Sequence, residues 1–361
     1  MDNTSIKYIL EKDNLTHFDI VRLLLTDENE RKLLFAKAAE IKFKYVGNKV
    51  YLRGLVEYTN KCIKNCYYCG IRKDNKNLHR YVVSDNEVIE AAKYAYDNGF
   101  GSIVIQSGEN KSKTFTQKIA HLLDEINKIS KGKLGITLSL GEQTEDTYKI
   151  WKEKGARRYL LRIETSNNDL YKKLHPNNKL HDFNNRLNCL LILKKLGYQV
   201  GTGVMIGLPF QNIEHLTADL EFFKAIDVDM VGMGPYIEHE NTHLYQCKTQ
   251  LLSKRDRFIL SLKMIAILRI MMKDINIAAT TAMQTLDKQG REKAIKVGAN
   301  IIMPNLTPLK YRTDYLLYEG KPCIDEEGSE CIKCIEARIK IAGAEIAYNE
   351  WGDSKHYYNR N

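Results

Sequence analysis

Residues 57–70 read Glu57-Tyr-Thr-Asn-Lys-Cys62-Ile-Lys-Asn-Cys66-Tyr-Tyr-Cys69-Gly70. Three of the chain's eight cysteines therefore stand close together, at the spacing Cys-x3-Cys-x2-Cys. They follow an apolar, β-branched run that begins at Leu55 and indicates a strand. Thiolates at this spacing are soft ligands for an iron–sulfur cluster, and one loop can wrap it. Because a 4Fe–4S cluster has one more iron than this loop has sulfurs, one iron would stay open to a ligand.

Other interpretations of these cysteines fit less well. Structural zinc needs four ligands, and no histidine or fourth cysteine stands close to the loop. Disulfides are typical of secreted chains, whereas Met1–Ile20 is polar and has no apolar signal-peptide core. The longest apolar stretch, Phe258–Met272, contains Lys263 and Arg269, which favours a buried helix over a membrane span. We therefore expect a metalloprotein of the reducing cytoplasm that does not contact a membrane.

Positive charge gathers around the cysteine loop in a chain whose formal net charge is +10. Such a surface could steer an acidic redox partner or offset the negative charge of a thiolate-bound cluster. An ordinary solvated surface explains the same residues about equally well. No nucleic-acid-binding motif accompanies the charge, so we expect no nucleic-acid partner. The cations are Lys61, Lys64, Arg72, Lys73, Lys76, His79 and Arg80.

Apolar, β-rich runs alternate with helical stretches along the rest of the chain. This alternation is typical of a parallel (β/α)8 TIM-type barrel, and a doubly wound open sheet is the alternative. In both folds the functional residues collect at the carboxyl ends of the strands. We predict an N-terminal helical segment at 1–48, the barrel at 49–308 and a cysteine-bearing extension at 309–361. The expected strands are 55–60, 102–108, 135–141, 159–165, 199–209, 230–237, 275–283 and 300–308.

Polar residues at two strand ends indicate ligand contacts. One expected strand ends in Gln106-Ser-Gly-Glu109, where the glycine lets the backbone approach a ligand and the carboxylate could hold an ammonium group. Another carries Arg158, Arg162 and Glu164, which alternation puts on one side of the strand. Charges in an apolar strand are costly unless they are paired or face a polar site. They indicate either a ligand site or an ion pair low in the barrel.

A second cysteine group, Cys323-x7-Cys331-x2-Cys334, leads into the last expected helix. Its spacing suggests a smaller cluster, such as 2Fe–2S, with a non-cysteine or absent fourth ligand, and a degenerate or empty site is the alternative. Cys189 lies on an apolar helical face and is predicted to be an inert core thiol. Cys247 is predicted to be a free loop thiol.

Several motifs in order along about residues 20–345 resemble the radical S-adenosylmethionine (SAM) enzymes and, among them, the HydE family of FeFe-hydrogenase maturases. The cysteine loop and Tyr68 match the superfamily signature, in which SAM chelates the fourth iron. Ile163 departs from the histidine expected at its position. The other matching motifs are Asp74-Asn75-Lys-Asn77-Leu-His-Arg80-Tyr81, Gln106-Ser-Gly-Glu109, Leu161-Arg-Ile-Glu-Thr165, Asn185-Arg186-Leu-Asn-Cys189, Thr280-Thr-Ala282, Met303-Pro-Asn305 and the C-terminal cysteines.

The resemblance implies separate roles for the site residues, which would bind the cluster, SAM or the substrate. Cys62, Cys66 and Cys69 would ligate a 4Fe–4S cluster, which on reduction by one electron cleaves SAM to methionine and a 5′-deoxyadenosyl radical. Tyr68 would lie by the adenine, and the other SAM contacts would be Ser107, Glu109, Glu164, Arg186 and Met303. The substrate cavity beneath would be lined by Gln106, Thr137, Arg158, Arg162, Thr280, Thr281, Tyr315 and Tyr318.

The same resemblance implies the partners. The substrate would be a small iron–cysteine–CO–cyanide complex from the maturase HydG, and the product would move towards the di-iron subcluster assembled on HydF. A ferredoxin or flavodoxin would supply the electron.

Three other functions stay open at this point. Methylornithine synthase shares the barrel and much of the motif set but lacks the C-terminal cysteines. Biotin synthase holds a second cluster with strand cysteines. Here the five expected strands from 102–108 to 230–237 contain no cysteine. A non-catalytic iron–sulfur carrier would have little use for Glu109 or for charged side chains on a strand.

Overall fold

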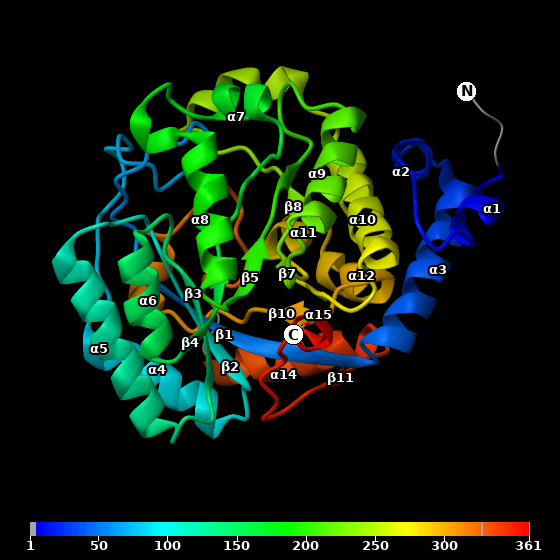
Figure 1. The fold of residues 1–361 in the computed structure, drawn as a ribbon. Helices are drawn as coiled ribbons and strands as arrows, with labels where there is room; N and C mark the ends of the chain where they lie inside the picture. The colour runs from blue at the N-terminus through cyan, green and yellow to red at the C-terminus, as the bar shows by residue number, and fades with distance from the viewer. Residues whose placement is uncertain (1–4, 326–327, 361) are drawn as a thin grey trace.

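The N-terminal segment is helical and leads into the first strand. The computed structural model describes residues 5–325 and 328–360. It describes the side chains of all these residues except 328–331. Helices α1 (Ile6–Leu10), α2 (His17–Leu24) and α3 (Glu28–Tyr45) come first. The second and third begin with capping boxes, in which the N-cap side chain and an acidic residue three positions later satisfy each other's backbone N–H groups. Figure 1 shows this blue segment on the outside of the molecule.

Eight parallel strands form a closed ring. Seven neighbouring pairs are joined by sheet ladders, and the eighth junction is closed by the bonds Asn300 N to Ile277 O and Ala279 N to Ile301 O, both 2.9 Å. The predicted TIM-type barrel is therefore confirmed, and the open sheet is excluded. In ring order the strands are β1 (Lys49–Thr59), β2 (Ser102–Ser107), β3 (Gly135–Ser139), β4 (Ala156–Leu160), β5 (Gln199–Thr202), β7 (Met230–Val231), β9 (Asn276–Ile277) and β10 (Ile301–Ile302).

Helices pack around the outside of this ring (Figure 1). A short pair, β6 (Met205–Ile206) and β8 (Gly234–Pro235), continues the sheet above β5 and β7. No helix in the described ranges is long and apolar enough to cross a membrane. The outer helices and 3-10 turns are α4 (Asp85–Asp97), α5 (Lys113–Ile129), α6 (Glu145–Glu153), α7 (Asn168–Leu174), η1 (Lys179–His181), α8 (Phe183–Lys195), α9 (Ile213–Ala225), η2 (His243–Gln250), α10 (Lys254–Met271), α11 (Thr281–Leu286), α12 (Gly290–Val297) and α13 (Leu309–Arg312).

Helix α10 is buried on nearly every side because it lies between α3 and the barrel. Two of its three buried cations, Lys263 and Arg269, are tied to backbone carbonyl groups. Lys263 Nζ donates to the carbonyl oxygens of Leu24 and Thr26, at 2.8 and 2.7 Å. Arg269 donates to the carbonyl oxygen of Gly298 through two nitrogens. The charges that interrupt this apolar stretch therefore join helices and loops around the barrel.

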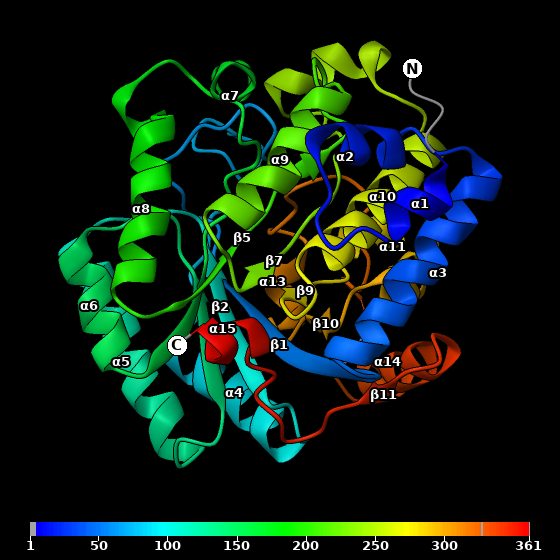
Figure 2. The same cartoon turned by 45° about the vertical axis from the view of Figure 1, so that its right-hand side comes forward.

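The C-terminal segment closes the amino end of the barrel. It comprises α14 (Gly328–Ile341), β11 (Glu345–Ile346), which pairs with β1, and α15 (Lys355–Arg360). The carbonyl oxygen of Gly352 accepts from Arg53 Nη2 at 2.9 Å and from Asn276 Nδ2 at 2.8 Å. The next residue, Asp353, pairs with Arg158. In Figure 2 the red helix α15 lies across the strands.

Helix α15 is anchored to the barrel by His356, which predicts a pH dependence of stability. Its Nε2 lies 2.7 Å from Asp227 Oδ1, and its Nδ1 lies 2.9 Å from Asp274 Oδ1. The hydrogen bond with Asp274 is the largest cause of a raised His356 pKa. The stabilisation should therefore be complete below about pH 6.5 and disappear as the pH rises through the higher folded-state pKa.

Urea denaturation at several pH values checks this expectation. Over that pH window, the free energy of unfolding should fall by about 1 kcal/mol more in the wild type than in His356→Gln. Parallel profiles for the two proteins would contradict the role of His356.

Candidate functional site

The three-cysteine loop lies at the carboxyl end of β1, against the end of β2. Cys62 Sγ accepts hydrogen bonds from the backbone N–H groups of Lys64 at 3.4 Å and Glu109 at 3.3 Å. Burial raises the pKa of the Cys66 thiol to about 12, and the nearby charge of Cys62 adds to the shift. Burial also raises the pKa of Cys69, and the nearby charges of Cys66 and Cys62 raise it further. The three sulfurs therefore share one electrostatic environment and ionise readily only when a metal replaces their protons.

Arg80 holds the backbone of this loop in shape. Its guanidinium donates to five carbonyl oxygens, those of Asn60, Ile71, Arg72, Lys73 and Asn75, at 2.6 to 3.2 Å. Lys64 likewise points inward, into an ion network beside the cysteines. Two of the cations that the sequence suggests for a basic surface therefore organise the interior.

Gly108 sets how closely β2 approaches the loop, and its substitution gives a testable prediction. An added Cβ would lie 2.5 Å from the carbonyl oxygen of Lys61 and 2.8 Å from Cys62 Cβ, so the loop would have to move. We expect Gly108→Ala to lower iron retention after anaerobic reconstitution and to slow catalysis by on the order of tenfold or more. Gly232→Ala is the control, since the nearest atom there, Arg162 Nη1, is 3.9 Å away. Equal iron content in both variants would contradict this role.

A network of five charged side chains, four of them buried and Lys111 exposed, adjoins the cysteine loop. Its members are Lys64, Glu109, Lys111, Glu142 and Arg186. Lys64 Nζ lies 2.9 Å from Glu142 Oε1 and 3.4 Å from Glu109 Oε1. Glu109 Oε1 is buried and accepts no hydrogen bond from the described residues. Despite the cost of burial, the cations Arg186 and Lys64 lower the pKa of Glu142, which is therefore ionised.

Sequence reasoning named Glu109 and Arg186 as SAM contacts and Lys64 only as one of the cations around the cysteine loop, and it missed Lys111 and Glu142. A signal for Glu142 was present, because Gly141-Glu142 follows β3 as Gly108-Glu109 follows β2. Gly141 has φ +75, and an added Cβ would lie 2.5 Å from Glu109 Cγ. The two Gly-Glu turns therefore pack against each other at neighbouring strand ends.

Tyr68 is held by a histidine that the sequence analysis did not single out. Its hydroxyl lies 3.3 Å from His175 Nε2, and the two rings meet edge to face. His175 Nδ1 lies 2.9 Å from the carbonyl oxygen of Tyr171, so Nδ1 carries the proton and Nε2 accepts from Tyr68. Burial lowers the pKa of His175, in agreement with a neutral ring. This arrangement fixes the ring of Tyr68 beside Cys66.

Several side chains at the carboxyl ends of the strands stay partly exposed although the strands themselves are buried. Gln106 Nε2 donates to the Tyr315 hydroxyl at 3.3 Å, and the hydroxyls of Thr281 and Tyr318 are 2.6 Å apart. Partial exposure at the mouth of a closed barrel indicates a cavity. Of the predicted lining, Gln106, Arg162, Thr280, Thr281 and Tyr318 have this exposure, as does the predicted SAM contact Met303, and sequence reasoning missed Leu55, Ser139 and Leu160.

Three residues predicted to line the cavity are placed differently. Thr137 and Arg158 are 0% exposed and Tyr315 is 1% exposed. Arg158 Nε donates to Thr137 Oγ1 at 2.9 Å, and Nη1 pairs with Asp353 of the C-terminal segment. The alternative of an ion pair low in the barrel therefore holds for Arg158, because its guanidinium is occupied at the amino end.

Two predicted SAM contacts are occupied within the protein. Glu164 has φ +68 and pairs with Arg162 through two hydrogen bonds of 2.9 and 3.0 Å. Ser107 Oγ donates to the carbonyl oxygen of Gly108 at 2.7 Å. Arg186 Nη1 donates to the carbonyl oxygen of Arg162 at 2.8 Å, which connects the ion network to β4. Ser107, Glu164 and Arg186 all stand at the mouth of the barrel, beside the cysteine loop.

The C-terminal cysteines lie near the start of α12. Cys323 Sγ accepts from Arg291 Nη2 at 3.3 Å, and Cys334 Sγ accepts from Arg338 Nε at 3.4 Å. Arg338 also pairs with Glu292, the neighbour of Arg291, at 2.8 Å. The predicted third ligand, Cys331, has a side chain outside the described residues. Cys189 is buried, as a core thiol should be.

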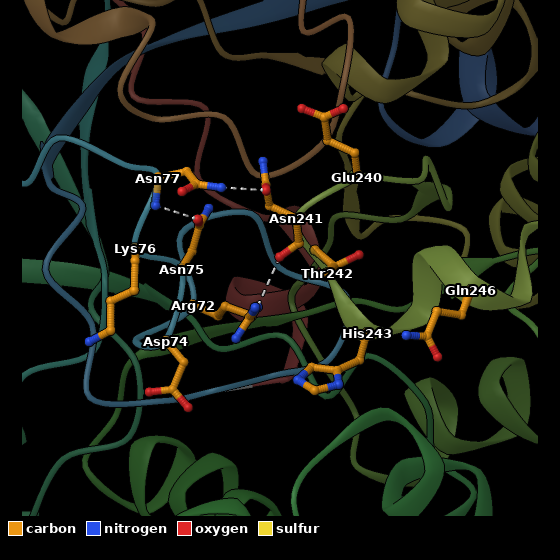
Figure 3. Close-up of a pocket in the computed structure, with 10 residues that line it drawn as sticks. All are labelled: Arg72, Asp74, Asn75, Lys76, Asn77, Glu240, Asn241, Thr242, His243 and Gln246. Atoms are coloured by element: carbon orange, nitrogen blue, oxygen red, sulfur yellow. Dashed lines mark hydrogen bonds between the residues drawn. The ribbon is translucent and has the colours of Figure 1, made fainter.

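A polar hollow of about 330 Å³ lies on the outer side of the cysteine loop (Figure 3). Arg72 Nε donates to the carbonyl oxygen of Asn241 at 3.0 Å, and Asn77 Nδ2 donates to Asn241 Oδ1 at 2.9 Å. Figure 3 shows both cationic and anionic side chains around it, so its charge is mixed. The lining residues are Arg72, Asp74, Asn75, Lys76, Asn77, Glu240, Asn241, Thr242, His243 and Gln246.

Comparison with known proteins identifies the family. The model of the Radical SAM superfamily matches residues 56–223. The "[FeFe] hydrogenase maturase subunit HydE" of Thermotoga maritima is 46% identical over 336 residues, which cover 93% of this chain and 92% of that protein. The chain belongs to the HydE family of radical SAM proteins.

Solved structures agree with the HydE-family barrel. The structure of methylornithine synthase (PylB) matches with a TM-score of 0.79 and 26% identity, over 96% of this chain and 98% of that one. The maturase HydG from Carboxydothermus hydrogenoformans matches with a TM-score of 0.78 and 20% identity, over 95% and 79% of the two chains. At that identity the likeness to HydG shows the fold alone.

Membership in the HydE family confirms the predicted cofactors, a 4Fe–4S cluster and SAM, and the predicted class of radical SAM enzyme. The residues fit both groups. The three thiols, of which Cys66 is buried and the other two partly exposed, share one environment. Two backbone N–H groups point at Cys62 Sγ, as they would at a bound thiolate. Glu109 Oε1, which accepts no hydrogen bond from the described residues, is a suitable acceptor for the ammonium group of SAM.

Proposed function

We propose that this chain cleaves SAM reductively and acts in assembly of the di-iron subcluster of FeFe-hydrogenase. One observation carries the proposal: a three-cysteine loop packed against a buried carboxylate oxygen, Glu109 Oε1, that accepts no hydrogen bond from the described residues. The 46% identity to a FeFe-hydrogenase maturase subunit supports the choice of pathway.

The proposed roles follow from the positions of the side chains. Cys62, Cys66 and Cys69 would hold the cluster, which when bound supplies the electron that splits a carbon–sulfur bond of SAM. Glu109 and Arg186 would hold the amino-acid end of SAM, since both lie in the buried ion network. Tyr68, held by His175, would lie by the adenine. The closed barrel and the C-terminal segment across its amino end would exclude water from the reaction.

The substrate and partners are the finer part of the proposal. Gln106, Arg162, Thr280, Thr281 and Tyr318 would contact a small iron–cysteine–CO–cyanide complex delivered by HydG, and the product would pass to HydF. A ferredoxin or flavodoxin of the cytoplasm would reduce the cluster. Residues 49–308 would carry the chemistry, 1–48 would support the barrel from outside, and 309–361 would cover both ends and present the second cysteine group.

An anaerobic assay tests the proposal. The reconstituted protein, given SAM and dithionite, should form 5′-deoxyadenosine and methionine, and its gene should restore hydrogenase activity to cells that lack HydE. Absence of 5′-deoxyadenosine would overturn the enzymatic part. Formation of methylornithine, without complementation, would favour the activity named for the structural relative PylB.

A further inference from the structure

Glu142 occupies the centre of the buried ion network. It is 0% exposed and touches four other polar groups. Its Oε1 lies 2.9 Å from Lys64 Nζ and 3.0 Å from Arg186 Nε, and its Oε2 accepts from Asn185 Nδ2 at 2.6 Å. Its backbone N–H donates to Glu109 Oε2 at 3.0 Å. Each oxygen of the Glu142 carboxylate therefore accepts a hydrogen bond, one from Lys64 and one from Asn185.

The neighbouring carboxylate of Glu109 is less well partnered. Lys64 Nζ stands 3.4 Å from Glu109 Oε1, and Arg186 Nη2 stands 3.8 Å from Glu109 Oε2, both farther than their distances to Glu142. Lys111 Nζ lies 3.4 Å from Glu109 Oε1 without forming a hydrogen bond to it. Lys64 and Arg186 thus lie nearer Glu142, whereas Lys111 lies nearer Glu109. Glu109 Oε1 is buried, yet it accepts no hydrogen bond from the described residues.

We propose that Glu142 is a positioning residue that holds Lys64 and Arg186 away from Glu109, so that Glu109 Oε1 can accept the ammonium group of SAM. The inference rests on the proposed use of SAM by this chain. Three cations face two carboxylates in the network, and a neutral residue at 142 would leave Glu109 alone with all three. Lys64 would then need to move only a fraction of an ångström to fill the free oxygen. A hydrogen bond from Lys64 would take up one acceptor position of this oxygen, and the nearby positive charge would repel an ammonium group.

Binding measurements on the reconstituted protein test this role without relying on turnover. Equilibrium dialysis gives the Kd of SAM and of an analogue that carries hydrogen in place of the amino group. The wild type should prefer SAM. In Glu142→Gln, the affinity for SAM should fall by on the order of tenfold or more, while that for the analogue stays nearly the same.

Matched variants separate positioning from general support of the fold. Glu145→Gln removes an exposed carboxylate three residues away, which pairs with Lys195, and should bind both ligands as the wild type does. Lys64→Gln added to Glu142→Gln should restore part of the preference for SAM, because the competing cation is gone. Asn185→Ala is a milder change, which frees Glu142 Oε2 and should lower the preference by about threefold.

The outcomes are decisive in each case. An unchanged preference in Glu142→Gln, or an equal loss of affinity for both ligands, would overturn the inference. If that variant does not retain iron, Asn185→Ala decides, and an unchanged preference there has the same meaning. A wild-type protein that binds cluster but not SAM would instead overturn the proposed function.

Discussion

Cys66→Ala is expected to reduce formation of 5′-deoxyadenosine by at least about a thousandfold. The loop offers three sulfurs, and Cys66 is the most buried of them, at 8% exposure. Without this ligand the cluster would lose one of the three sulfur bonds that the loop offers. Iron and sulfide content after reconstitution, together with product formation from SAM, measures the effect.

Cys247→Ala is the matched control for this substitution. Cys247 is a partly exposed thiol in the 3-10 turn η2 and should leave iron content and SAM cleavage unchanged. A Cys66→Ala protein that forms 5′-deoxyadenosine at the wild-type rate would refute the assignment of the cysteine loop. Loss of activity in Cys247→Ala as well would point to general damage to thiols.

The second large effect is expected on stability, from Asp353→Asn. Arg158 and Arg53 are 0% and 1% exposed, and Asp353 pairs with the first and offsets the charge of the second. Removing one partner of a buried ion pair costs about 3–5 kcal/mol because the other charge stays buried and uncompensated. We expect a fall in Tm of on the order of 10 °C by calorimetry.

Two further variants show whether the buried pair is the cause. Glu350→Gln removes the carboxylate of the more exposed pair with Lys49 in the same C-terminal segment, and should have little effect. Arg158→Gln added to Asp353→Asn should recover part of the loss, because no charge is then left without its partner. If Asp353→Asn destabilises the protein no more than Glu350→Gln, the C-terminal segment does not hold the barrel in this way.

Much of the fold was predictable because its signals are local. The strand expected at 102–108 is observed at Ser102–Ser107, since its apolar pattern lies within the element. The first strand was expected only from Leu55, whereas β1 begins at Lys49. Its earlier part contains Arg53, a residue atypical of a buried strand, whose partner Gly352 lies at the far end of the chain.

The candidate site likewise has some features that the local sequence predicts and others that depend on distant residues. The cysteine spacing and the Gly-Glu turn after β2 are short patterns, so the sequence alone determined the kind of cofactor and the end of the barrel that holds it. Only the tertiary structure decided the surroundings of each charge. It sent Arg158 to the amino end with Asp353, turned Lys64 and Arg80 inward, and joined Glu142 to Glu109.

The physical reason is the range of the interactions. A pattern of side chains within one loop or strand needs no other part of the chain to have meaning. The pairing of a buried charge depends on which distant segment the fold brings within about 4 Å, and many sequence positions compete for that place. The sequence therefore determined which chemistry this protein can carry, and the closed barrel decided which charges are free to take part in it.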